Sequence, residues 1–138
     1  MRFSEHELTA ALTGAATSVL ARQRGKVRKG QDAAEVWEAM DRYERFKMLD
    51  AIGGQVLPVL VALPDVEVAA GARPAYSESE VSQVVAGLVG DDVGRLKRAV
   101  LVKTRTALVL LALAHVPLRL DPDALLHGSP EEPEEGGA

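Results

Sequence analysis

The stretch that decides how this chain begins to fold is FSEHELTAALTG, residues 3–14. Ser4 is a favoured N-cap residue, and Glu7, three positions later, completes a capping box in which each residue bonds the backbone N–H of the other. Phe3, before the box, and Leu8, directly after it, form a hydrophobic staple. Aliphatic residues then recur at spacings of three and four, which predicts a helix that runs to about Arg24.

The same pattern returns 73 residues later as YSESEVSQVVAG, residues 76–87, where Ser77 and Glu80 predict a second capping box and a second helix start. Both stretches have glycine as the twelfth residue. Two explanations remain open. One is an internal duplication of a helical hairpin, which would place Arg22 opposite Arg95. The other is independent use of the same capping chemistry at two helix starts.

The middle of the chain contains a third helix start at Asp32, with Glu35 at the capping-box position. An apolar stripe follows, and Gly53-Gly54 predict an interruption of this helix. Residues 56–63 are almost entirely apolar and contain Pro58, so they fit either a short buried helix or a buried strand.

The end of the ordered region is predicted to be a long helix over residues 93–115, after a connecting loop at 64–75 and the helix that starts at Ser77. The first half of the last helix carries cations, whereas its second half, ALVLLALA, is apolar on every side. A helix that is apolar all round is surrounded by protein. We therefore expect it either at the centre of the bundle or in an oligomer interface.

The distribution of charge divides the chain into two predicted parts. Residues 121–138 contain six acids and no bases and are rich in proline and glycine, which is typical of a disordered segment. Residues 1–120 carry a net charge of +2, although the whole chain of 138 residues carries −4. The predicted fold is all-α: a compact bundle of four to five helices over 1–120 with a disordered acidic C-terminal tail over 121–138.

Several classes of protein are excluded or disfavoured by the sequence. There is no cysteine, so disulfides and thiolate chemistry are excluded. A membrane span needs about 18 apolar residues, and the two longest apolar runs, 56–63 and 107–114, are much shorter. Glu5 and Glu7 stand where a signal peptide would be basic and then apolar. We therefore expect a soluble, cytoplasmic protein that does not contact membranes.

No motif for catalysis, phosphate binding or metal binding is present. His6, His115 and His127 are not spaced to share a metal with another ligand, so structural roles are the better interpretation. The sequence thus predicts no enzyme activity, no catalytic residue, no metal site and no cofactor.

The stretch ARQRGKVRKGQD, residues 21–32, is the one strongly basic segment before the last helix. It admits three interpretations: a solvated loop between helices, a contact for a polyanion such as nucleic acid, or a docking site for an acidic protein. The acidic tail is a candidate competitor for it. The cations involved, with those of the last helix, are Arg22, Arg24, Lys26, Arg28, Lys29, Arg95, Lys97 and Arg98.

Three of the five aromatic residues, Trp37, Tyr43 and Phe46, lie in the segment after Asp32. Phe46 is predicted to be a core residue. Trp37 and Tyr43 have two interpretations, as anchors of the core or as hot spots on a partner surface, where such residues are enriched.

These observations together favour a non-enzymatic helical protein-interaction module, an adaptor or regulatory subunit whose partner is another protein or a second copy of itself. Arginine outnumbers lysine eleven to five and asparagine is absent, a bias associated with bacterial genomes. The alternative is a nucleic-acid-binding protein that uses residues 22–29 and the basic half of the last helix.

Overall fold

The computed structural model describes residues 1–23, 25 and 27–119, which form five helices and no strand. In chain order these are α1 (Glu5–Arg22), α2 (Ala33–Ala39), α3 (Arg42–Ala62), α4 (Glu78–Val89) and α5 (Arg95–Ala114). The predicted all-α bundle is confirmed for this part of the chain, and the predicted acidic tail lies outside it. No helix among the described residues combines the length and apolar character needed to cross a bilayer.

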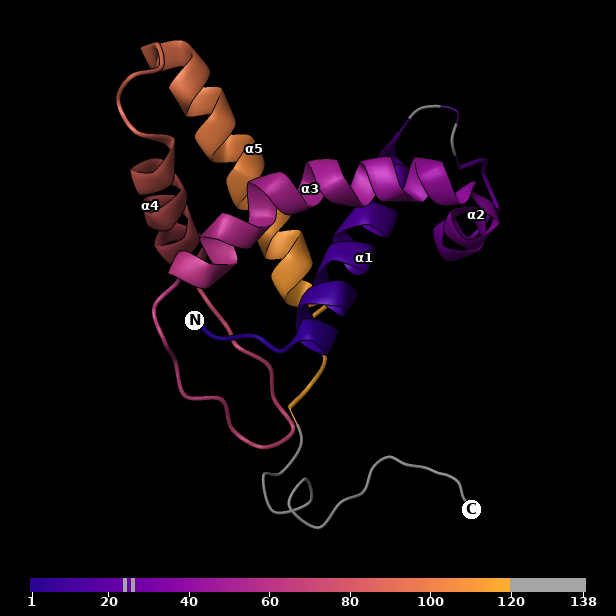
Figure 1. Ribbon diagram of the computed structural model, residues 1–138, viewed down its shortest axis with the longest axis horizontal. Coiled ribbons are helices and arrows are strands. Elements are labelled where there is room, and N and C mark those ends of the chain that lie inside the picture. Colours follow the sequence, from indigo (N-terminus) through magenta and orange to yellow (C-terminus); the bar gives the residue numbers. More distant parts are fainter. Residues whose placement is uncertain (24, 26, 120–138) are drawn as a thin grey trace.

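The helices are arranged around α3 and α5, as Figure 1 shows. α3 crosses over both α1 and α5, while α4 and α5 form a hairpin on one side and α2 lies on the other. α5 packs against α1, α3 and α4, and α2 packs mainly on α1. The predicted central position of the last helix is therefore confirmed.

The core is built from small and branched aliphatic side chains because the chain contains only five aromatic residues. α1 contributes three fully buried alanines, so it presents a thin surface that α3 and α5 approach closely. The buried residues of the four long helices include Ala11, Ala15, Ala16, Leu20, Ile52, Val56, Val59, Leu60, Val81, Val85, Val109, Ala112 and Leu113.

The predicted interruption at Gly53-Gly54 is wrong, because α3 continues through both glycines and through Pro58. Each glycine costs a helix about 1 kcal/mol relative to alanine, but tertiary packing routinely outweighs such a cost. Here Gly53 is itself buried in the core-facing side of α3. Residues 56–62 are helical, so the choice between helix and strand is resolved in favour of helix.

The helix break lies instead at Met40 and Asp41, whose backbones are extended at ψ of 149° and 140°. Neither residue is glycine or proline. Asp41 is followed three positions later by Glu44, a spacing typical of helix starts, although no side-chain cap bond forms at this position. The short helix α2 and the long helix α3 thus replace the single helix that was expected.

The segment between α3 and α4 is irregular, as predicted, and several long-range bonds hold it. The Tyr76 hydroxyl donates to the Pro64 carbonyl at 2.6 Å, which closes the segment on itself. Gly71 and Ala72 exchange backbone hydrogen bonds with Arg119, and the Arg73 side chain donates to the Val116 carbonyl at 2.8 Å. This segment therefore fixes the chain that follows α5.

Candidate functional site

The first basic segment lies at the end of α1 and in the connection to α2. Arg22, Arg28 and Lys29 are exposed there, while Arg24 and Lys26 lie outside the described residues. The connection and α2 border a shallow hollow of about 610 Å³, in which Arg28 faces the same space as Asp32 and Glu35. Acids therefore line the hollow together with the cation.

The second basic segment is the first half of α5, where Arg95 and Lys97 are exposed. Arg98 has a structural role: its guanidinium donates to the carbonyls of Gly90 at 2.6 Å and Ala86 at 2.9 Å, and lies 3.9 Å from Asp91. Both carbonyls lie at the end of α4, where the Ala86 carbonyl also accepts the backbone N–H of the C-cap Gly90 at 3.3 Å. Arg98 thus closes the α4–α5 hairpin.

The structure does not bring the two basic segments together. In Figure 1 the first half of α5 lies at the upper left, whereas the α1–α2 connection lies at the upper right, near the start of α3. A polyanion would have to cross the face of the bundle to contact both. The cations proposed as one surface therefore belong to two separate places.

The aromatic residues of α2 and α3 divide between core and surface. Trp37 is buried, with 5% of its surface exposed, whereas Tyr43 and Phe46 are each 62% exposed. The prediction that Phe46 is a core residue is wrong. The core-facing stripe of α3 follows Leu49, Ile52 and Val56 at helical spacing, and Phe46 falls beside this stripe rather than on it.

The exposed aromatic residues form what we call the aromatic–arginine surface: Arg42, Tyr43, Arg45 and Phe46. A pocket of about 280 Å³ opens beside them, and its lining also includes the buried Trp37. The Lys47 ammonium lies 4.9 Å from the centre of the Tyr43 ring, a cation–π contact that orients the ring. Of the two candidate partner residues, Tyr43 is therefore directly accessible, and Trp37 contributes to the pocket from below.

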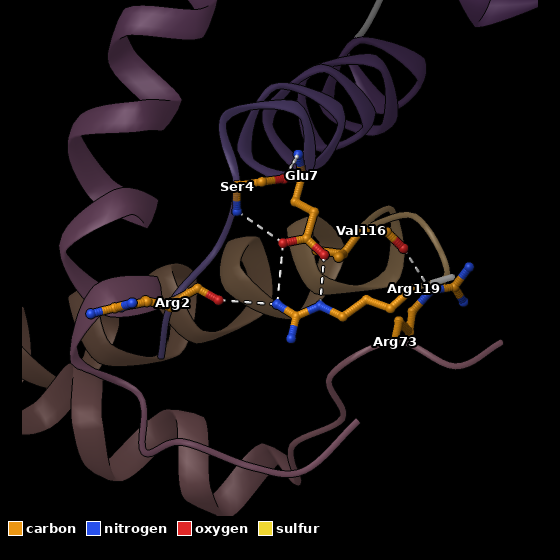
Figure 2. A network of polar contacts seen from close by, with 6 residues as sticks. All are labelled: Arg2, Ser4, Glu7, Arg73, Val116 and Arg119. Atoms are coloured by element: carbon orange, nitrogen blue, oxygen red, sulfur yellow. Dashed lines mark hydrogen bonds and ion pairs between the residues drawn. The ribbon is translucent and has the colours of Figure 1, made fainter. Parts of the chain in front are cut away.

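A polar network that the sequence analysis did not predict joins the two ends of the described chain (Figure 2). The Arg119 guanidinium donates to both oxygens of Glu7, at 2.8 and 3.1 Å, and to the Arg2 carbonyl at 3.0 Å. Glu7 also accepts from the Ser4 backbone at 2.9 Å. Only 9% of the Glu7 surface is exposed, whereas the Arg119 side chain is 31% exposed, so this is a partly buried, bidentate ion pair.

The electrostatics of this network favour the charged carboxylate. Burial of Glu7 favours the neutral form and acts to raise its pKa, but the hydrogen bonds from Arg119 and Ser4 outweigh burial and hold the pKa of Glu7 below its ordinary value of 4.5. The hydrogen bond with Glu7 likewise raises the pKa of Arg119. Three hydrogen bonds to its two oxygens hold the Glu7 carboxylate in place.

The sequence signal for this network is incomplete. The capping box identifies Glu7 as an N3 residue, but nothing in its pattern selects Arg119, which is 112 residues away. The pairing of Arg119 with Glu7 depends on where α5 ends and on how residues 71–73 hold the chain that follows α5.

The described residues contain no group of three or more His, Cys, Asp or Glu side chains that could hold a metal ion. Comparison with family models, curated proteins and solved structures finds no match to this chain.

Proposed function

We propose that this protein is a non-enzymatic protein-interaction module, an adaptor or regulatory subunit, and that the aromatic–arginine surface contacts its partner. The observation that supports this proposal is the exposure of Tyr43 and Phe46, each at 62%, one helical turn apart on α3. Full burial of a side chain such as Phe stabilises by about 1.5–3 kcal/mol. Two such side chains at one place offer that gain to a partner.

The composition of the surface fits a protein partner. Interface hot spots are enriched in Trp, Tyr and Arg, and the surface combines Tyr43 and Phe46 with two arginines above the buried Trp37. The pocket of about 280 Å³ beside Phe46 has room for one apolar side chain of a partner. Arg42 and Arg45 at its rim suit carboxylates that flank such an anchor.

The nucleic-acid alternative has weaker support. Its two basic segments lie apart, and Arg98 is used in closing the α4–α5 hairpin. The exposed neighbours of the cations on α5 are the aliphatic Leu96 and Val100, whereas single-stranded nucleic acid is bound by aromatic side chains that stack on bases.

The test is a comparison of wild-type protein with the double variant Tyr43→Ala/Phe46→Ala and with the control Val61→Ala. Val61 is a similarly exposed residue, at 66%, at the other end of α3. A protein captured from native lysate is purified, and its affinity for all three forms is measured by calorimetry. Because hot-spot truncations cost about 2 kcal/mol or more, the double variant should bind about 30-fold more weakly or worse, and Val61→Ala should bind as wild type.

Two outcomes would contradict the proposal. One is equal affinity of all three forms for every captured protein. The other is binding of mixed DNA or RNA that weakens steeply with salt and is abolished by charge reversal at Arg28 and Lys29, which would favour the nucleic-acid alternative. Thermal melts of each variant show whether the fold is retained.

A further inference from the structure

α5 has a second apolar stripe on the side that faces away from the bundle. Leu96, Val100, Lys103 and Ala107 recur at spacings of four, three and four, so they lie on one face of the helix. All four are exposed, Leu96 at 83% and Val100 at 63%. We call these four residues the outer stripe. The first half of α5, which carries most of this stripe, extends beyond α1 and α3 in Figure 1.

The outer stripe has an excess of positive charge from its own helix, although Glu78 shares a hollow with Lys103 and Asp91 shares one with Arg95. α5 contains five cations and no acid in its 20 residues. Among the described residues, the ion pairs of the protein include Arg98 but not Arg95, Lys97 or Lys103. A segment that covers this face must therefore combine apolar side chains with a row of acids.

The chain itself contains such a segment. Residues 120–138 carry six acids and no bases, together with Leu120, Leu125 and Leu126. No other stretch of the sequence holds six acids without a cation among them. Its composition is complementary to the outer stripe in both charge and apolar character.

The point from which this segment departs makes the contact feasible. Arg119 is held at the start of α1 by Glu7 and by the backbone of Gly71 and Ala72. From Ala114 back to Leu96, α5 rises about 27 Å at 1.5 Å per residue. An extended chain spans about 3.3 Å per residue, so residues 120–138 reach up to about 60 Å. A short tether also gives an effective concentration in the millimolar range.

A second copy is a poorer occupant of this face. Two outer stripes brought together would place the cations of one α5 against those of the other, and like charges across an interface are unfavourable. We propose that residues 120–138 dock on the outer stripe of their own chain, with Leu125 and Leu126, which extend at most about 23 Å from Arg119, against its Ala107 end and the acids of residues 131–135 against Arg95, Lys97 and Lys103. This contact excludes other acidic partners from α5. It does not depend on the proposed function, which uses a different surface.

Paramagnetic relaxation enhancement in the full-length protein tests the proposal. The chain has no cysteine, so Ser129→Cys gives a single site for a nitroxide label. The amide signals of residues 96–107 should be broadened selectively. This broadening should fall to the level of α3 amides in 0.5 M salt, or when Lys97→Glu/Lys103→Glu or Leu125→Ala/Leu126→Ala is introduced. The matched control, Arg28→Glu/Lys29→Glu, makes the same charge change in the other basic segment and should leave the broadening intact.

Three results would overturn the proposal: uniform weak broadening over the bundle, broadening centred on residues 22–29, or no loss of the signal at residues 96–107 in the Lys97→Glu/Lys103→Glu variant. A mixture of isotope-labelled protein without nitroxide and unlabelled protein with nitroxide separates docking within one chain from docking between copies. Broadening in that mixture equal to that of the singly labelled chain would also overturn it.

Discussion

The starts of α1 and α4 are near-identical locally and different in their surroundings. Ser4 accepts from the Glu7 backbone at 3.1 Å and Ser77 from the Glu80 backbone at 3.1 Å. The reciprocal bonds from each serine backbone to the glutamate side chain are both 2.9 Å. The predicted capping boxes at Ser4 and Ser77 are thus confirmed, with the same geometry, whereas at Asp32 the side chain accepts from the Ala34 backbone and no box with Glu35 forms.

The two boxes differ in what lies around them. Glu7 is buried and receives both donors of Arg119, whereas Glu80 is exposed. The twelfth residue of each repeat differs in the same way. A Cβ on Gly14 would lie 2.1 Å from Cγ of His115, whereas a Cβ on Gly87 would meet no atom within 4 Å. Similar local sequences therefore make contacts with distant segments in α1, whereas in α4 they form only the capping box itself.

The similarity of the two segments is limited to these starts. α1 continues beyond Gly14 to Arg22, whereas α4 ends at Val89 and gives way to a turn through Gly90 at φ +78°. An internal duplication therefore remains a hypothesis.

The largest expected difference in stability is between alanine substitutions at Gly14 and at Gly87. Gly14→Ala should destabilise the protein by about 2–3 kcal/mol. Overpacking costs about 3 kcal/mol, or more in severe cases, and the higher helix propensity of alanine offsets only about 1 kcal/mol of this cost. Rotation of the His115 ring cannot relieve the clash, because its Cβ also lies within 2.4 Å. Gly87→Ala should stabilise by about 0.5–1 kcal/mol. Urea denaturation measures the free energy of unfolding of both variants. Equal changes at Gly14 and Gly87 would contradict the different packing of the two glycines.

The next largest difference in stability is expected between alanine substitutions at Glu7 and at Glu80. Glu7→Ala removes a bidentate partner from Arg119 as well as a cap bond, so it should destabilise by about 2 kcal/mol. Glu80→Ala removes only the exposed half of its capping box and should cost about 0.5–1 kcal/mol. Arg119→Ala should reduce the difference between these two costs in a double-mutant cycle. An unchanged difference would show that the ion pair is not its source.

The dependence on pH isolates the ion pair from packing. Because the pKa of Glu7 is lowered in the folded protein, its contribution to stability is fully present above about 4.5 and is lost as pH falls through the lower folded value. Wild type should therefore be more stable than Glu7→Gln at pH 7, and the difference should shrink as pH falls below 4.5 and through the lowered folded pKa. Thermal denaturation from pH 3 to 7 provides the measurement, and a constant difference would contradict the assignment.

The smallest effect should be shared by both boxes. Ser4→Ala and Ser77→Ala each remove one side-chain acceptor from an exposed N-cap, so each should cost about 1 kcal/mol. A clearly larger cost at Ser4 would mean that the cap and the ion pair of α1 are coupled rather than separate.

Prediction from sequence worked where the physical cause is local. The capping boxes at Ser4 and Ser77 and the loop before α4 depend on neighbouring residues, and these predictions are confirmed. The glycine pair in α3 and the position of Phe46 were misjudged, because packing outweighed helix propensity and a turn at Met40 and Asp41 reset the faces of α3. The roles of Arg98 and Arg119 depend on helix ends that only the assembled bundle brings near them.

Local sequence patterns are enough to show that this chain is helical, where four of its helices begin, and that its last 18 residues carry acids without bases. Those properties follow from backbone hydrogen bonding and side-chain spacing over a few residues. The assembled bundle shows that Glu7 rather than Glu80 pairs with an arginine, that Gly14 rather than Gly87 has no room for a side chain, and which aromatic and aliphatic residues are exposed. Each of these outcomes depends on contacts between segments far apart in the sequence, and the local spacing of residues does not predict such contacts.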